Sequence, residues 1–187
     1  MDGPGNERIS SKPVYTGRIV NLAIDTVRMP DGSTSDIEMI RHSGAAGVLP
    51  VLSDPGGPDP LILLIRQYRY AAGGTLLEIP AGRPDRAGED WEACARRELQ
   101  EETGLIAETL IPLTTIFTTP GFTDERIHLF MATGLRMGTS AHERDEFIEP
   151  VTLPLSNALE QIRDGGITDA KTICAILYAA GYRMGAG

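Results

Sequence analysis

Cysteine is scarce in this chain, with two residues among 187. Cys94 and Cys174 each stand beside small apolar residues, in stretches that read as helical. A free cysteine in such surroundings behaves as a small hydrophobic side chain. We therefore expect two buried free thiols.

A nucleophile motif is also lacking. The three histidines, His42, His128 and His142, show no metal-ligand spacing, and no Ser or Cys motif of a covalent hydrolase accompanies them. The sequence therefore disfavours nucleophilic covalent catalysis.

Positive charge is in deficit, since 17 Lys and Arg face 26 Asp and Glu, for a net charge of −9 and a pI near 4.8. Phosphate backbones demand clustered Lys and Arg, so this balance opposes a large nucleic-acid interface. A small anionic substrate stays compatible only if bound cations or local arginines reverse the field inside the site.

Long apolar runs are absent, and none approaches the ~20 residues that span a bilayer. The N-terminus also lacks a basic segment followed by an apolar one. We expect no membrane partner and a cytoplasmic location.

The chain is long enough for one substantial core, with an appendage before it. Residues 1–42 form a β-rich region around the turn at 30–33, with too few strands to be stable alone. Residues 43–187 mix strands and helices, which predicts an α/β domain with helices covering a mixed sheet. Strands are expected at 47–52, 61–70, 76–79, 110–118 and 127–132, helices at about 89–103, 155–163 and 169–182, and an acidic loop at 143–149.

Three carboxylates crowd one face of the helix expected at 89–103. Glu98, Glu101 and Glu102 stand at i, i+3 and i+4, so like charges meet unless cations or solvent separate them. Spacing alone leaves two readings open, a metal site or a solvated helix whose charge Arg96 and Arg97 offset.

A longer pattern surrounds these carboxylates. Gly82 precedes Glu89, and seven residues later the chain reads Arg-Glu-Leu-Gln-Glu-Glu-Thr-Gly-Leu over 97–105. This resembles the signature of the Nudix hydrolase family, with one extra residue between Gly82 and Glu89. The insertion falls in a loop before the helix, which can absorb it. The resemblance implies a Nudix fold, an α/β/α sandwich around a mixed sheet, with an N-terminal antiparallel β unit.

The resemblance also implies a divalent metal, Mg²⁺ with Mn²⁺ as a substitute. Its expected ligands are Glu98, Glu102, Glu101 and the carbonyl of Ala81. Mg²⁺ prefers such hard oxygen donors and shares them with substrate phosphates. Arg97 is expected to orient the glutamates by ion pairing, with Glu89 either supporting it or stabilising the helix N-terminus.

The substrate is indicated by residues after the helix. Pro120 follows Gly104 by sixteen residues, and 120–126 read Pro-Gly-Phe-Thr-Asp-Glu-Arg. This placement resembles the ADP-ribose pyrophosphatase subgroup, which implies hydrolysis of ADP-ribose to AMP and ribose 5-phosphate. Glu125 is expected near the metals or the ribose, unless it is a solvent-facing charge in a turn.

Two further groups are expected at the diphosphate. Glu146, in the acidic loop, resembles the loop carboxylate that serves as general base in this subgroup, with Glu101 or Glu102 as alternatives and a solvated loop as the plain reading. Arg69 closes a long apolar strand, and the resemblance assigns it to the diphosphate, which an arginine can pair bidentately.

The same resemblance implies a homodimer in which N-terminal strands reach the partner's site. Arg18 and Ile19 are then expected to contact the adenine, and Glu78 is expected to be a partner of the same adenine base. Two alternatives stay open, a Nudix enzyme acting on another nucleotide sugar or nucleoside polyphosphate, and a catalytically silent domain that senses a ligand.

Overall fold

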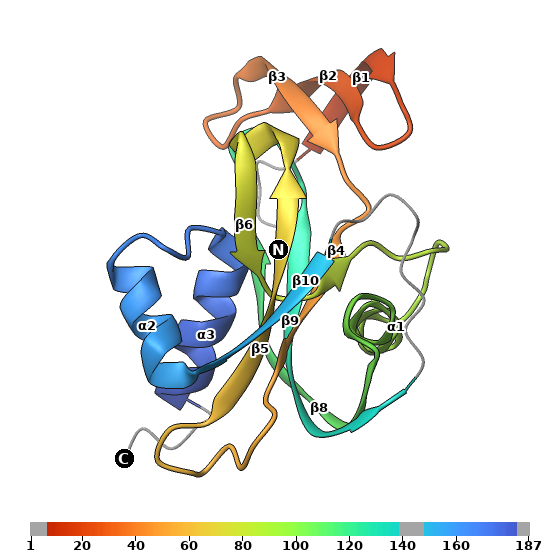
Figure 1. Ribbon diagram of the computed structural model, residues 1–187. Helices are drawn as coiled ribbons and strands as arrows, with labels where there is room; N and C mark the ends of the chain where they lie inside the picture. The colour runs from red at the N-terminus through yellow and green to blue at the C-terminus, as the bar shows by residue number, and fades with distance from the viewer. Residues whose placement is uncertain (1–6, 139–147, 183–187) are drawn as a thin grey trace. The chain divides into compact units, whose positions relative to one another are not determined.

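The structure is a computed structural model that describes residues 7–138 and 148–182, in two compact units (Figure 1). One unit contains the chain up to Gly44 together with Phe117–Arg126, and the other contains Ala45–Ile116 and the residues from Ile127 on. Segment Phe117–Arg126 thus folds with strands that lie far before it in the sequence. The domain boundary placed between residues 42 and 43 stays a prediction.

The first unit holds the expected antiparallel sheet, in the order β1-β2-β3, with β1 Glu7–Thr16, β2 Asn21–Arg28 and β3 Thr34–Arg41. The β2–β3 turn forms because Asp31 accepts hydrogen bonds from the backbone and hydroxyl of Ser33. The side chains of strand β1 are all exposed, so no alternation of buried and exposed residues marks its start.

The second unit contains two sheets, β7-β4-β9-β8 and β10-β5-β6. The first is mixed, because β4 runs parallel to β9 and antiparallel to β7. The expected mixed sheet is therefore confirmed. Its strands, with a 3-10 turn at Tyr70–Ala72, are β4 Ala45–Pro50, β5 Leu61–Arg69, β6 Gly74–Glu78, β7 Ala81–Gly82, β8 Leu105–Phe117, β9 Arg126–Met137 and β10 Ile148–Pro154.

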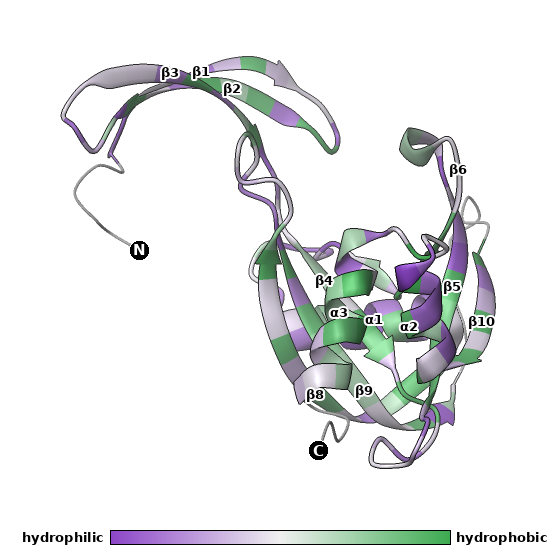
Figure 2. Cartoon of the chain, turned by 90° about the vertical axis from the view of Figure 1, so that its left-hand side faces the viewer, coloured by the Kyte–Doolittle hydropathy of each residue, from purple (hydrophilic) through white to green (hydrophobic). Residues whose placement is uncertain are grey.

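Helices cover both sides of this unit, with α1 on one side and α2 and α3 on the other (Figure 1). Strand residues alternate between the two layers, so Ile62 and Leu64 join the cluster under α2 and α3, whereas Leu63 and Ile65 join the cluster under α1. Because both of their faces are buried, β4 and most of β5 are nearly continuous apolar runs. Figure 2 shows hydrophilic and hydrophobic residues mixed along α2 and α3, as expected of helices with one buried face.

The helices are α1 Trp91–Thr103, α2 Leu155–Arg163 and α3 Ala170–Tyr182. Helix α1 begins two residues later than expected, because Asp90 caps it by accepting hydrogen bonds from the backbone N–H of Glu92 and Ala93. Gly104 ends it in the left-handed conformation, with φ 72°. No helix in the described ranges is long and apolar enough to cross a membrane.

Strand β10 corrects one expectation, since the sequence suggested a loop through residue 149. Ile148 and Glu149 instead belong to β10, which pairs antiparallel with β5. Pro150 and Pro154 argue against a central strand, but β10 lies at the edge of its sheet, where a missing N–H costs no ladder hydrogen bond. The rest of the expected loop lies outside the described residues.

Both cysteines are free, as expected. Cys94 is buried in the layer under α1, whereas Cys174 is half-buried and packs against the other layer, so the expected burial is confirmed for Cys94 and wrong for Cys174.

Candidate active site

Helix α1 carries the signature carboxylates against β7. The side chain of Glu102 is 3% exposed, and its Oε2 accepts a hydrogen bond from the backbone N–H of Ala81 at 3.1 Å. Glu98 is also buried, whereas the Glu101 side chain is 40% exposed. Glu98 and Glu102 therefore face the protein at β7, as their i, i+4 spacing predicts, and Glu101 lies at the rim.

Gly82 makes room for one of these carboxylates. A Cβ atom built on Gly82 would lie under 3.0 Å from the Glu98 carboxylate, closer than real Cβ atoms approach other atoms. The glycine of the signature is thus explained by the space that Glu98 occupies beside β7.

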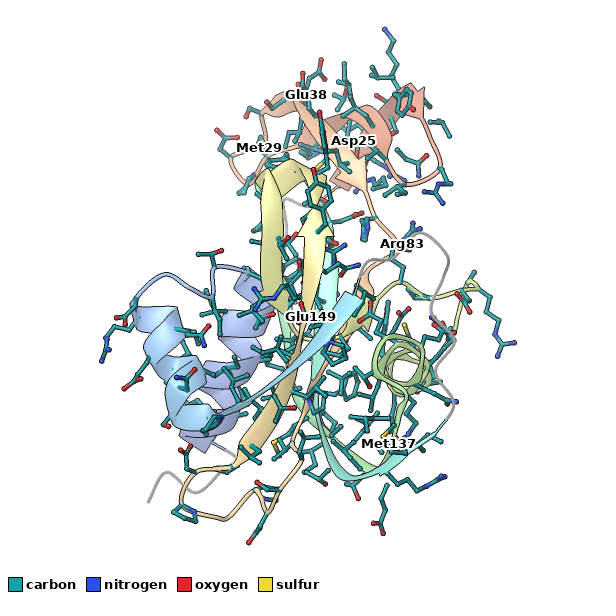
Figure 3. The ribbon with its side chains drawn as sticks, in the orientation of Figure 1. Asp25, Met29, Glu38, Arg83, Met137 and Glu149 are labelled. Atoms are coloured by element: carbon teal, nitrogen blue, oxygen red, sulfur yellow. The ribbon has the colours of Figure 1, made fainter. Side chains whose placement is uncertain are left out.

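Arg97 ties the acidic cluster together. Its Nη1 donates to Glu98 at 2.8 Å and to Glu101 at 2.9 Å, and its Nη2 donates to Glu89 at 3.3 Å. Nη2 also donates to the backbone carbonyl of Arg83, a residue labelled in Figure 3, at 2.9 Å. Burial disfavours the charged guanidinium, but its acidic partners outweigh this effect and raise the pKa of Arg97.

Cys94 lies beside this cluster without reactive character. Its Sγ donates to the carbonyl of Gly82 at 3.7 Å. Burial, with a smaller contribution from the charge of Glu98, raises the pKa of the Cys94 thiol to about 12. A thiol that stays protonated is a poor nucleophile, so Cys94 is a packing residue.

The donor chemistry of this cluster fits a hard divalent cation. Glu98 and Glu102 offer carboxylate oxygens, and Ala81 lies next to them on β7 with a carbonyl oxygen. In the described ranges, no group of three or more His, Cys, Asp and Glu side chains is arranged so that these side chains alone could hold a metal ion. Mg²⁺ does not require such a cage, because it keeps several waters and binds through a few carboxylates and substrate phosphates.

A second ionic cluster joins β5, β6 and α3. Arg69 donates from Nε and Nη2 to the two oxygens of Glu78, at 2.8 and 2.9 Å. The Glu78 side chain is 1% exposed, and Lys171 on α3 also donates to its Oε2. The hydrogen bonds to Glu78 raise the pKa of Arg69, and the charge of Glu102 adds to this shift. The carboxylate cluster on α1 and the ionic cluster around Glu78 therefore interact electrostatically.

The α3 side of this cluster is the part that the sequence did not predict. Asp169 accepts hydrogen bonds from Lys171 Nζ at 3.0 Å and from the Thr172 hydroxyl at 2.6 Å. The Thr172 hydroxyl in turn accepts one from the backbone N–H of Ile79, at 2.8 Å. Residues 169–172 begin a helix far along the chain, and only the Asp-x-x-Thr spacing, typical of a helix start, marks them.

The paired Glu78 makes stability depend on pH. Burial alone would raise the pKa of Glu78, but Arg69 and Lys171 together lower it below the ordinary value of 4.5. The pairing therefore contributes fully above that value and is lost as the pH falls through the lowered pKa.

Substituting Glu78→Gln should reduce the free energy of unfolding at neutral pH by about 3 kcal/mol, because two cations lose their buried partner. It should also flatten the loss of stability that occurs as the pH falls below 4.5, measured by urea unfolding. Glu149→Gln is the matched control, since Glu149 is 72% exposed and pairs with Arg66 at 3.4 Å. Equal acid sensitivity of Glu78→Gln and the wild type would contradict this account.

The remaining expected substrate residues lie in the first unit. Arg18 and Ile19 are exposed in the turn between β1 and β2, and Pro120 is exposed in the turn before β9. The Glu125 carboxylate accepts a hydrogen bond from the Thr118 hydroxyl at 2.8 Å and lies 3.2 Å from Nδ1 of His42. The roles of these four residues stay predictions, as do the role of Glu78 at the adenine and that of Glu146, which lies outside the described residues.

Hydrogen bonds join the turn that contains Pro120 to strand β3. The Ile40 backbone N–H donates to the carbonyl of Phe122 at 2.8 Å, and Arg41 donates to Asp124 at 3.0 Å. Arg41 also pairs with the buried Asp25, a residue labelled in Figure 3. A groove of about 660 Å³ lies along this side of the sheet, lined by Arg8, Asp25, Val27, Met29, Pro30, Ile37, Met39, Arg41 and Pro120.

Comparisons with known proteins show to which family this chain is similar. The NUDIX domain matches residues 41–175. An ADP-ribose pyrophosphatase of Bacillus subtilis is 37% identical over 172 residues, which cover 91% of this chain and 90% of that protein. One of Mycobacterium tuberculosis is 38% identical over 173 residues, covering 91% and 81%. A methanol dehydrogenase activator of Bacillus methanolicus is 38% identical over 172 residues, covering 91% and 90%.

A solved structure shares the fold. The crystal structure of an ADP compounds hydrolase matches with a TM-score of 0.80, over 95% of this chain and 94% of that one, at 21% identity. The NUDIX match spans most of the chain and contains the whole α1 cluster from Ala81 to Gly104. The chain therefore belongs to the NUDIX family of hydrolases.

Proposed function

We propose that this protein hydrolyses the diphosphate of ADP-ribose, giving AMP and ribose 5-phosphate. The observation that carries the proposal is the pair of buried carboxylates packed against β7, where Glu98 pairs with Arg97 and Glu102 accepts a hydrogen bond from the backbone N–H of Ala81. The substrate is supported by the two relatives named ADP-ribose pyrophosphatase, which align with nine-tenths of the chain.

The proposed cofactor is Mg²⁺, with Mn²⁺ as a substitute, held by Glu98, Glu102 and the Ala81 carbonyl, with Glu101 as a further ligand. Such an ion offsets the diphosphate charge and lowers the pKa of bound water. The bound cation also offsets the repulsion between an anionic substrate and a chain whose net charge is −9.

The chain's own residues hold the reacting groups. Arg97 fixes the orientation of Glu98 and Glu101 by donating to both from one nitrogen. Arg69 binds the diphosphate with the donors that Glu78 leaves available, since a guanidinium has five and Glu78 takes two. With Lys171 also paired to it, Glu78 acts as a positioning residue for Arg69.

The attacking water requires a proton acceptor, for which Glu146 remains the proposed base. Glu101 is the described alternative, because its side chain is 40% exposed and so accessible to substrate and water. The pH profile of kcat is compared for Glu146→Gln and Glu101→Gln. The variant that lacks the base should lose roughly 10²–10⁴-fold in kcat and should lose the rise of kcat with pH that titration of the base causes.

The first unit is proposed to select the substrate within a homodimer. A three-stranded sheet is small for independent stability, and apolar side chains of its first half are exposed, namely Ile9, Val14, Tyr15, Ile19 and Val20. Pro120 and Glu125 contribute from one chain, and Arg18 and Ile19 from its partner. The cytoplasmic location stays a prediction.

A substrate panel tests the proposal. The panel contains nucleotide sugars, dinucleoside polyphosphates and nucleoside triphosphates, each with Mg²⁺. We expect kcat/KM to be highest for ADP-ribose, about 10-fold or more above the next compound, because losing one substrate contact worth ~1.4 kcal/mol in the transition state lowers kcat/KM tenfold. Light scattering on the same preparation should give twice the 20.1 kDa of one chain. A higher kcat/KM for another compound would reassign the substrate, and binding without product would indicate a ligand sensor.

A further inference from the structure

A buried acceptor without a partner lies on β5. Gln67 is 6% exposed, and its Oε1 has no hydrogen-bond partner, the one such buried side-chain atom within residues 7–138 and 148–182. Buried polar atoms nearly always have partners, because an unsatisfied acceptor destabilises the fold. Such an acceptor is satisfied by an ordered water or by a donor that a bound ligand brings.

Gln67 shares a strand face with the Arg69–Glu78 pair. Residues two apart on a strand point to the same face, so the side chains of Gln67 and Arg69 lie on the same face of β5. Strand β6 pairs antiparallel with β5, with Glu78 opposite Ile65 and Leu76 opposite Gln67. Figure 1 shows these two strands side by side. The amide thus lies one position further along the face that presents the arginine assigned to the diphosphate.

We propose that Gln67 Oε1 accepts a hydrogen bond from a ribose hydroxyl of the substrate, an inference that rests on the proposed function. Diphosphate oxygens are acceptors at neutral pH, so they cannot satisfy a carbonyl oxygen. The donors of ADP-ribose are its ribose hydroxyls and the amino group of adenine. Gln67 and Arg69 are about 7 Å apart along the strand. The ribose hydroxyls adjoin the diphosphate, whereas the adenine amino group lies at the far end of the nucleoside.

This contact makes Gln67 a specificity-determining residue. A site built to hydrogen-bond a substrate hydroxyl discriminates against an analogue that lacks it, because the buried acceptor is then left unsatisfied. In the enzyme without substrate the acceptor is unsatisfied, so Gln67 lowers the stability of the free protein, whereas it strengthens the binding of the substrate. Function and stability are expected to move in opposite directions when the amide is removed.

The test is Gln67→Met, which keeps the side-chain length and removes the amide. Without ligand, its Tm should rise by about 2–4 °C, while kcat/KM for ADP-ribose should fall about tenfold. Gln67→Leu makes the same test if the methionine variant does not fold. Gln161→Met on α2 is the matched control, since the Gln161 amide has a partner, Asn157 Oδ1, at 2.7 Å. Its kcat/KM should equal that of the wild type.

Substrate analogues identify the donor. An analogue lacking the contacted ribose hydroxyl should lose about tenfold in kcat/KM with the wild type and nothing further with Gln67→Met. Equal discrimination by both enzymes against every deoxyribose analogue would overturn the inference. So would a loss confined to the analogue with hypoxanthine in place of adenine. A wild type that does not hydrolyse ADP-ribose at all would instead reject the proposed function, before any variant is compared.

Discussion

Replacing Glu98 or Glu102 by Gln should lower kcat for ADP-ribose by roughly 10³-fold or more, while each variant stays folded. Both carboxylates are buried at β7, and Glu102 is anchored there by the Ala81 backbone N–H. An amide keeps the shape of the side chain but has one neutral oxygen in place of two charged ones. Charge stabilisation worth several kcal/mol then disappears from the transition state.

The matched control is Glu92→Gln on the same helix. Glu92 is exposed and pairs with Arg96 at 2.8 Å, and it lies six residues before Glu98 on α1. Its loss should change kcat less than twofold and stability by about 0.3–0.5 kcal/mol. Steady-state kinetics with saturating Mg²⁺ make the comparison. Wild-type turnover in both Glu98→Gln and Glu102→Gln would remove the basis for the metal assignment.

Substituting Gly82→Ala should lower kcat about 10²-fold with little loss of stability. The added Cβ would collide with the Glu98 carboxylate, which is the end of a flexible side chain and can turn away. A displacement of about 1 Å at a reacting group suffices for a loss of this size. Kinetics and thermal unfolding on the same sample measure the two effects.

Gly181→Ala is the control for this substitution. Gly181 lies near the end of α3, and a Cβ there meets no atom within 4 Å. Its activity should be unchanged, and its stability should rise slightly, since Ala favours a helix more than Gly does. If Gly82→Ala kept full activity, the packing of Glu98 against β7 would not matter for catalysis.

Local patterns in the sequence predicted the parts of the fold that depend on near neighbours. The i, i+4 spacing placed Glu98 and Glu102 on one helix face, and Gly104 marked the helix end. The bounds of α2 were predicted without error. In each case the determining interactions lie within a few residues, as in helix periodicity and capping.

Contacts between distant segments could not be predicted in the same way. Lys171 meets Glu78 across 93 residues, and Arg41 meets Asp124 across 83. No local pattern in the sequence encodes such pairs, although they hold Arg69 and the Pro120 turn. The unpartnered oxygen of Gln67 is likewise visible only once β5 is packed. Strand β10 was missed because its prolines carry the signal of a loop, while its edge position tolerates them.

The most direct measurement is the formation of AMP and ribose 5-phosphate from ADP-ribose by the wild-type protein, with Mg²⁺ and with excess chelator. The site predicts equal amounts of both products with Mg²⁺ and loss of turnover with chelator, restored when Mg²⁺ is added back. Hydrolysis at the same rate in the presence of chelator, or no products with either Mg²⁺ or Mn²⁺, would contradict the account.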